Sequence, residues 1–91
     1  MTGDDPTAAG TSAYFNAGIP RLGVPELRTA DAGAGIARAG AVTAFPAGIA
    51  LAATWDPTLV PAYARAVADE ARATRHNVVL GPNADIVRNP R

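Results

Sequence analysis

The stretch from Gly23 to Gly35 reads Gly-Val-Pro-Glu-Leu-Arg-Thr-Ala-Asp-Ala-Gly-Ala-Gly, and the rest of the chain is interpreted around it. Residues 27–30 are predicted to form a short extended segment that ends at Asp31 and runs into a glycine-rich turn. Parallel α/β folds bind their ligands at the carboxyl ends of strands, so Asp31 is a candidate ligand-binding carboxylate. A second interpretation stays open, because aspartate is also frequent in turns and at helix N-termini, where it only caps the backbone.

The composition allows only a small hydrophobic core. The chain has 91 residues, fewer than a typical domain, and 48% of them are apolar. Alanine accounts for 22 residues, whereas the large side chains comprise one Trp, two Phe, two Tyr and one Met. Because hydrophobic stabilisation grows with buried area, a lone domain of this composition is expected to be marginally stable.

Charge and residue types exclude several classes of function. Eight acids balance eight bases, all of them arginine, and no basic stripe suits nucleic acid or an anionic membrane. The absence of cysteine and the single histidine argue against disulfides and against thiolate or multi-histidine metal sites, so no metal or cofactor is predicted. No apolar run approaches the ~20 residues of a membrane span. The acidic N-terminus has no apolar signal region, which favours a cytoplasmic location.

Gly33 and Gly35 have the two-residue spacing that begins a dinucleotide-binding fingerprint. The third glycine of that fingerprint falls at position 38, where this chain has Arg38. The acidic residue expected ~20 positions later in a second strand is also missing. A dinucleotide site is therefore not predicted.

Prolines and apolar runs in the rest of the chain predict loops and two further strands. Residues 1–13 read as a loop, and Tyr14-Phe15 is the first pair able to anchor onto a core. The prolines at positions 20 and 25 exclude a helix between residues 19 and 25. Two apolar runs, residues 49–55 and 77–82, are predicted as strands buried on both faces. A buried helical turn is the alternative for residues 49–55, because alanine favours helix.

A helix is predicted between these two runs, from Pro57 to about Thr74. Asp56 is its expected N-cap and Pro57 its first residue, while Pro61 removes one backbone hydrogen bond near its start. Apolar residues recur at steps of three and four and give the helix one apolar face. His76 is expected at the helix C-terminus, facing solvent. Strand, helix and strand with short links predict a right-handed parallel βαβ unit.

Three blocks of sequence carry a resemblance to a known family. They are Gly-Ile-Pro-Arg-Leu-Gly-Val-Pro at 18–25 with Leu27, Arg28 and Asp31; Thr-Ala-Phe-Pro at 43–46 with residues 49–57; and Asn-Val-Val-Leu-Gly-Pro at 77–82 with Ile-Val-Arg-Asn-Pro at 86–90. In order and spacing these blocks resemble the start of glycoside hydrolase family 3, the β-glucosidase family. The resemblance covers residues 18–91.

The resemblance implies a fold and a mechanism. Family members have a (β/α)8-type barrel followed by an α/β sandwich domain, and they hydrolyse β-linked sugars with retention, using an Asp nucleophile and a Glu acid/base. The expected fold class is α/β, the first βαβ part of a (β/α)8 TIM-type barrel that is incomplete in this chain, because eight units need about 250 residues. Residues 1–17 are then an N-terminal loop segment, and residues 18–91 the N-terminal part of the barrel domain.

The resemblance also implies a sugar-binding residue. The family motif, usually Asp-Gly-Pro-x-Gly-x-Arg, begins with an acid that hydrogen-bonds sugar hydroxyls where the glycosidic bond breaks, and this position is Asp31 here. An ionised carboxylate is suited to that task, because charged acceptors make the stronger hydrogen bonds.

The chain departs from this motif after Asp31. Ala32-Gly33 replaces the family's Gly-Pro, and the family's arginine falls on Ala37. Arg38, one place later, replaces that arginine only if the loop shifts by one residue. Arg88 is a further candidate for the wall of the sugar site, and a structural salt bridge is the alternative.

No catalytic residue is assigned within this chain. The family's nucleophile, its sugar-binding Lys-His pair and its acid/base lie further along the family sequence, so the 91-residue chain alone is predicted to be inactive. Two functions remain. The chain is part of a retaining β-glycosidase, whose partners are a β-linked glucoside and the remainder of the barrel and second domain, on this or another chain. Alternatively, it is a non-catalytic truncated fragment that associates with itself or a partner through open sheet edges.

Overall fold

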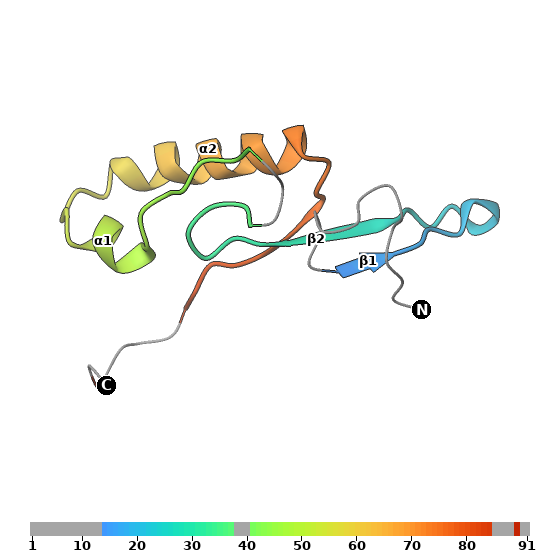
Figure 1. Cartoon of the computed structure of the whole chain (residues 1–91), viewed down its shortest axis with the longest axis horizontal. Coiled ribbons are helices and arrows are strands. Elements are labelled where there is room, and N and C mark those ends of the chain that lie inside the picture. The colour runs from blue at the N-terminus through green and yellow to red at the C-terminus, as the bar shows by residue number, and fades with distance from the viewer. Residues whose placement is uncertain (1–13, 38–40, 85–88, 90–91) are drawn as a thin grey trace.

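The computed structural model describes residues 14–37, 41–84 and 89, which form a three-stranded sheet with one long helix over it (Figure 1). In chain order the elements are β1 (Tyr14–Asn16), a single 3₁₀ turn (Pro20–Leu22), β2 (Leu27–Asp31), α1 (Gly48–Ala52), α2 (Leu59–Ala73) and β3 (Val78–Leu80).

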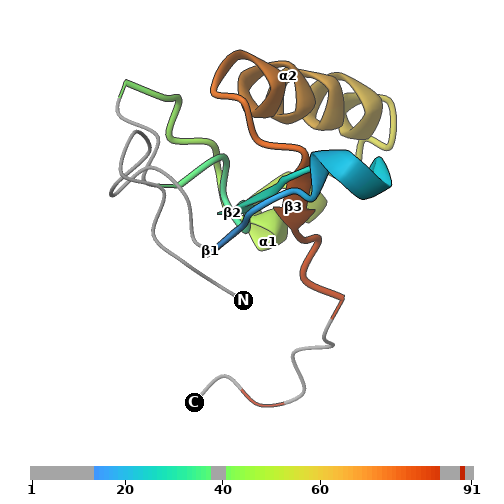
Figure 2. The same ribbon diagram turned by 90° about the vertical axis from the view of Figure 1, so that its right-hand side faces the viewer.

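The sheet has the strand order β1-β2-β3. Strand β1 runs antiparallel to β2, whereas β2 and β3 are parallel and pair Asp31 with Leu80 at their carboxyl ends. Figure 2 shows α2 lying over one face of this sheet. The predicted parallel βαβ unit is therefore present, but it is built from β2, α2 and β3, so residues 49–55 are not its first strand.

The hairpin between β1 and β2 includes the end of the expected N-terminal loop segment 1–17. Tyr14–Asn16 pairs with β2 as a strand and is not a loop. Residues 1–13 of that segment lie outside the described residues, so the expectation stays untested there. The 3₁₀ turn lies within residues 19–25, where no helix was expected, because Pro20 is compatible with the first position of a helical turn. Gly23 closes this turn with a φ of 67°, a left-handed conformation that glycine adopts without strain.

The apolar run 49–55, predicted as a buried strand, instead supplies residues 49–52 to the short helix α1, and residues 53–55 follow the helix, the first two as a turn. Alanine and leucine dominate the run, and both favour helix over strand. The alternative of a helical turn is thus confirmed, but not its burial, because Ile49 is 70% exposed and Trp55 92% exposed.

Helix α2 begins two residues later than predicted. The Asp56 carboxylate accepts hydrogen bonds from the backbone N–H of Thr58, at 2.9 Å, and from its hydroxyl, so Asp56 closes a turn ahead of the helix. The helix then begins at Leu59, and Pro61 is its third residue. The first four N–H groups of a helix have no intrahelical acceptor, so Pro61 costs α2 no hydrogen bond.

The link from α2 to β3 corrects the expectation for His76. The imidazole is buried, with 5% exposed, rather than facing solvent, and its Nδ1 lies 2.8 Å from the Thr74 hydroxyl. Arg75, at φ 63°, turns the chain sharply just before it. Asn77 then extends the pairing of β2 and β3, because its side chain accepts from the Arg28 N–H at 2.8 Å and its own N–H donates to the Arg28 carbonyl at 3.1 Å.

The hydrophobic core lies between the sheet and α2 and is small. Its buried members are Ala30, Ile36, Val67 and Ala71. Half-buried hydrophobic residues pack around them, namely Ala32, Val42, Phe45 and Tyr63. Because two of the four buried side chains are alanines, the small core expected from the composition is confirmed for the described part of the chain.

Candidate functional site

The candidate site is the carboxyl end of the two parallel strands. Asp31 is the last residue of β2 and pairs with Leu80, and the next residue, Ala32, donates its N–H to the Leu80 carbonyl at 3.3 Å. The Asp31 side chain is exposed, and within the described residues its carboxylate accepts no hydrogen bond. Only the Asp31 main-chain carbonyl closes a turn, by accepting from the N–H of Ala37 at 2.8 Å. This geometry favours an available carboxylate over a capping one.

The segment from Ala32 to Ala47, called the β2–α1 loop below, follows Asp31, and residues 38–40 of it lie outside the described residues. It folds back on itself, because the Phe45 N–H donates to the Ala34 carbonyl at 3.1 Å. Gly35 has a φ of 98°, and a Cβ there would lie 2.8 Å from both the Phe45 ring and the Thr43 carbonyl oxygen. Gly35 is therefore required by the turn itself.

That turn also bears on the rejected dinucleotide fingerprint. The fingerprint needs a helix that opens at its glycines, so that the helix N-terminus meets the phosphates. The described part of this loop contains no helix before α1, which begins at Gly48. The helix that the fingerprint requires directly after its glycines is therefore not found among the described residues of this loop.

Aromatic and carboxylate side chains of α2 hold the loop. The Phe45 and Tyr63 rings meet edge to face at a centroid distance of 5.2 Å, and the Tyr63 hydroxyl donates to the Pro46 carbonyl at 3.2 Å. Glu70 accepts from the Thr43 N–H at 3.0 Å and from the Thr43 hydroxyl. Sequence reasoning did not single out Glu70, since nothing in a single sequence pairs two residues 27 positions apart.

A second polar side chain lies beside the loop. Asn83 follows β3, and its amide nitrogen lies 3.5 Å from where a Cβ on Gly33 would be. The sequence analysis read this residue only as part of a polar loop, although a polar side chain just past a parallel strand is a usual signal for a site position. The two strand ends thus place Asn83 against the loop that follows Asp31.

Arg38 and Arg88, the other candidate sugar-binding residues, lie outside the described residues, so their roles stay predictions. Among the described residues, no groove and no cluster of acidic side chains adds to the site around Asp31. Three open surface grooves of about 250, 550 and 460 Å³ lie at the α1–α2 corner, on the β1–β2 hairpin and along α2, and Asp31 lines none of them. The described residues bring no three His, Cys, Asp or Glu side chains together as a metal site. No helix among them is long and apolar enough to span a membrane.

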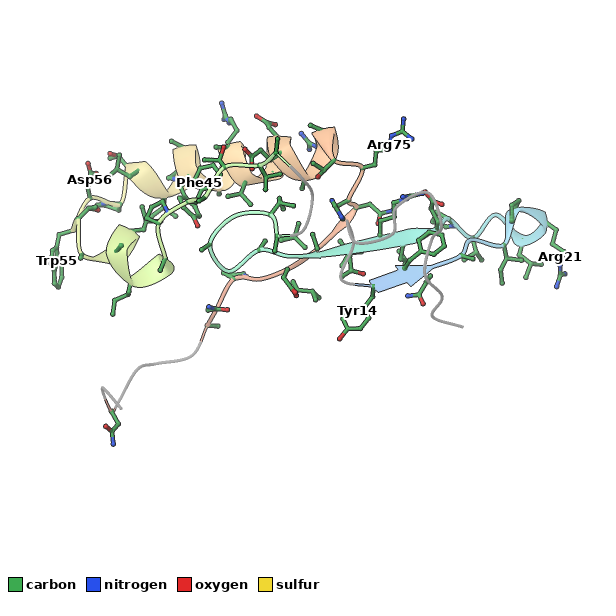
Figure 3. The ribbon with its side chains drawn as sticks, in the orientation of Figure 1. Tyr14, Arg21, Phe45, Trp55, Asp56 and Arg75 are labelled. Atoms are coloured by element: carbon green, nitrogen blue, oxygen red, sulfur yellow. The ribbon has the colours of Figure 1, made fainter. Side chains whose placement is uncertain are left out.

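The α1–α2 corner of the described chain exposes large apolar side chains, among them Ile49, Trp55 and Val60. Trp55 stands at this corner with 92% of its surface exposed, and Figure 3 shows it pointing away from both helices. It lines the groove of about 250 Å³ together with Leu51, Asp56 and Val60. The pKa of Asp56 is lowered from its ordinary value, first by the hydrogen bond from the Thr58 hydroxyl and then by that from the Thr58 N–H.

Comparison with known proteins shows the family. The chain is 39% identical over 90 residues to a β-glucosidase of Bacteroides ovatus, a match that covers 85% of this chain and 12% of the relative. It is 37% identical over 84 residues to a β-glucosidase of Pyricularia oryzae, covering 92% of this chain and 11% of the relative. The chain thus spans about one-tenth of the length of these relatives, and no solved structure is significantly similar to it. Residues 7–91 match the model of the glycosyl hydrolase family 3 N-terminal domain, and the chain belongs to that family.

Proposed function

We propose that the chain is part of a retaining β-glycosidase, similar to a β-glucosidase, that hydrolyses the O-glycosidic bond of β-linked glucosides. The observation that carries this proposal is the exposed Asp31 carboxylate at the carboxyl end of β2, in a chain of this family. A carboxylate that accepts no hydrogen bond from the described residues is suited to accept hydrogen bonds from two sugar hydroxyls and so to orient the ring. Asp31 binds substrate in this proposal, while the nucleophile and the acid/base come from the remainder of the enzyme.

The proposed architecture is a (β/α)8 barrel of which β2, α2 and β3 form the first βαβ part. The parallel pairing of β2 with β3, and α2 on a single face of the sheet, support this proposal. Barrels of this kind keep their helices outside and their active sites at the carboxyl ends of the strands, the end at which Asp31 stands. Polypeptide beyond these 91 residues supplies the other strands, and Arg38 and Arg88 are proposed as further sugar contacts.

The test is substitution of Asp31 in the complete enzyme. Asp31→Ala removes a charged acceptor worth about 1.5–3 kcal/mol, so kcat/KM for an aryl β-glucoside is expected to fall at least about tenfold. The matched control is Glu26→Ala, an acid just before β2 at its opposite end, which is expected to keep wild-type kinetics. A lower melting temperature with unchanged kcat/KM for Asp31→Ala means that Asp31 only caps a turn.

A non-catalytic fragment is the second candidate function, and one observation favours it. In the described sheet β3 is an edge strand, and its Leu80 side chain is 42% exposed. An open edge with apolar side chains is a site for association with another chain. Light scattering of the isolated chain and an activity assay of the complete enzyme separate the two candidates. Stable self-association of the chain, together with no glycosidase activity of the complete enzyme, supports the fragment.

A further inference from the structure

The carboxylate of Glu70 is the strongest polar link between α2 and the β2–α1 loop in the described chain. It accepts the Thr43 N–H at 3.0 Å on Oε1 and 3.2 Å on Oε2, and it also accepts the Thr43 hydroxyl. Both donors of one loop residue therefore converge on one charged acceptor, and hydrogen bonds to charged groups are about twice as strong as neutral ones.

Thr43 connects Glu70 to the turn after Asp31. Its carbonyl oxygen lies within 2.8 Å of the position of a Cβ on Gly35, so the two backbones are in close contact. Two residues past Gly35, the Ala37 N–H donates to the Asp31 carbonyl at 2.8 Å. A displacement of Thr43 is thus carried through a closely packed turn to the backbone of Asp31, because packed groups cannot move independently.

We propose that Glu70 is a positioning residue for the sugar site, which fixes the β2–α1 loop and through it the Asp31 carboxylate. The inference rests on the proposed function of Asp31. Glu70 lies on α2, on the side of the sheet that carries the helix, and in this proposal it acts without contacting the sugar. Its action on the sugar is entirely through Thr43 and the turn at Gly35.

The β2–α1 loop has other contacts with α2 besides Glu70. We therefore expect Glu70 to affect the position of Asp31 and not only the folding of the loop. The ring of Tyr63 packs on Phe45, and the Tyr63 hydroxyl bonds the Pro46 carbonyl. These contacts hold Phe45, which also packs against Gly35 and donates its N–H to the Ala34 carbonyl, and they do not involve Glu70. What Glu70 adds is a second anchor at Thr43, whose carbonyl oxygen contacts the same turn at Gly35.

The experiment compares three α2 variants of the complete enzyme that carries this segment. Glu70→Ala is expected to lower kcat/KM for an aryl β-glucoside about tenfold, measured well below the melting temperature of every variant. Glu70→Gln keeps an oxygen acceptor for the Thr43 N–H, so it is expected to recover most of the loss. Asp69→Ala is the matched control, because Asp69 is the neighbouring acid and, among the described residues, pairs with the exposed Arg72 at 3.8 Å and not with the β2–α1 loop.

A double-mutant cycle tests whether Glu70 acts through Asp31, because a residue with only a structural role would not give a non-additive loss of kcat/KM. If Glu70 acts through Asp31, then Glu70→Ala has little further effect on kcat/KM in the Asp31→Ala background. If Glu70→Ala prevents folding of the complete enzyme, Thr43→Val removes only the hydroxyl bond and is expected to give an intermediate loss with the same non-additivity. Full additivity, or a loss for Asp69→Ala equal to that for Glu70→Ala, overturns the inference.

The outcomes also separate this inference from the proposed function. A complete enzyme with no activity on any β-glucoside overturns the proposed function. An active enzyme that is impaired by Asp31→Ala but has wild-type kinetics with Glu70→Ala keeps the proposed function and overturns the role of Glu70 alone.

Discussion

The two faces of the sheet differ in what covers them, because α2 lies over one face only. On the α2 side, Ala30 is fully buried and packs with Val67 and Ala71 of the helix. The opposite side carries Tyr14, which Figure 3 shows pointing away from α2 and which is 60% exposed. By strand alternation and register, Leu27 and Leu80 share that open side, and each is 42% exposed.

Among the described residues, the sheet therefore has a helix packed on one face only. In the proposed barrel the opposite face lines the interior, where side chains of the other strands would cover it.

The largest effect expected from this comparison is on activity. The isolated 91-residue chain is expected to have no glycosidase activity, because a retaining glycosidase needs two catalytic carboxylates and the family places both further along its sequence. Hydrolysis of a chromogenic aryl β-glucoside by the purified chain measures this, with heat-treated chain as the control. Turnover that survives repurification contradicts the proposal that this chain needs the remainder of the enzyme for activity.

The next effect is on stability, and it contrasts one residue from each face. Leu80→Ala in the complete enzyme is expected to cost about 2–5 kcal/mol, because the open face is then a packed core. In the isolated chain the same change is expected to alter the urea dependence of the helical circular dichroism very little, since Leu80 is already 42% exposed.

The matched variant on the covered face is Ala30→Asp. It places a carboxylate at a position with 0% exposure, so it is expected to disrupt the packing of α2 in both contexts. The isolated chain is expected to lack a sharp calorimetric transition even without substitution. Equal effects of Leu80→Ala in the two contexts, or a cooperative melt of a demonstrated monomer, refute the open-face interpretation.

The parts of the fold that the sequence predicted correctly are those specified by local chemistry. Leu27–Asp31 formed the expected strand, and Asp56-Pro57 with the apolar period marked the helix that became α2. The run 49–55 was misassigned because a short apolar segment has no period that separates helix from strand, and its surroundings decide. Trp55 illustrates this, since a hydrophobic residue expected inside is 92% exposed.

The site was predictable only in part, for the same reason. Asp31 was found because it ends a strand and matches a family motif, and both signals are local. The burial of His76 depends on the turn at Arg75, with a φ of 63°, which no propensity specifies for arginine. The contact of Glu70 with Thr43 joins residues 27 apart, and Asn83 meets Gly33 only because β3 lies beside β2.

The smallest expected effect concerns the turn formed by Asp56 and Thr58. Its hydrogen bonds are local and involve no residue of the sheet. The pKa of Asp56 is lowered by the Thr58 hydroxyl and then by the Thr58 N–H, so Thr58→Val is expected to raise it back toward its ordinary value without restoring it fully. A carboxyl whose pKa is lower folded than unfolded stabilises the folded turn above the unfolded pKa, and this contribution is lost as pH falls through the folded pKa. The helix content is therefore expected to fall as the pH drops below about 4.

Carbon-13 titration of the Asp56 carboxyl measures the shift in its pKa. Thr54→Val is the control, because the Thr54 hydroxyl contacts the Asp56 N–H and not its carboxylate. Since the contact spans only two residues, the lowered pKa is expected in the isolated chain as well as in the complete enzyme. An ordinary pKa in the isolated chain and a lowered one in the complete enzyme mean that the start of α2, too, depends on covering the open face.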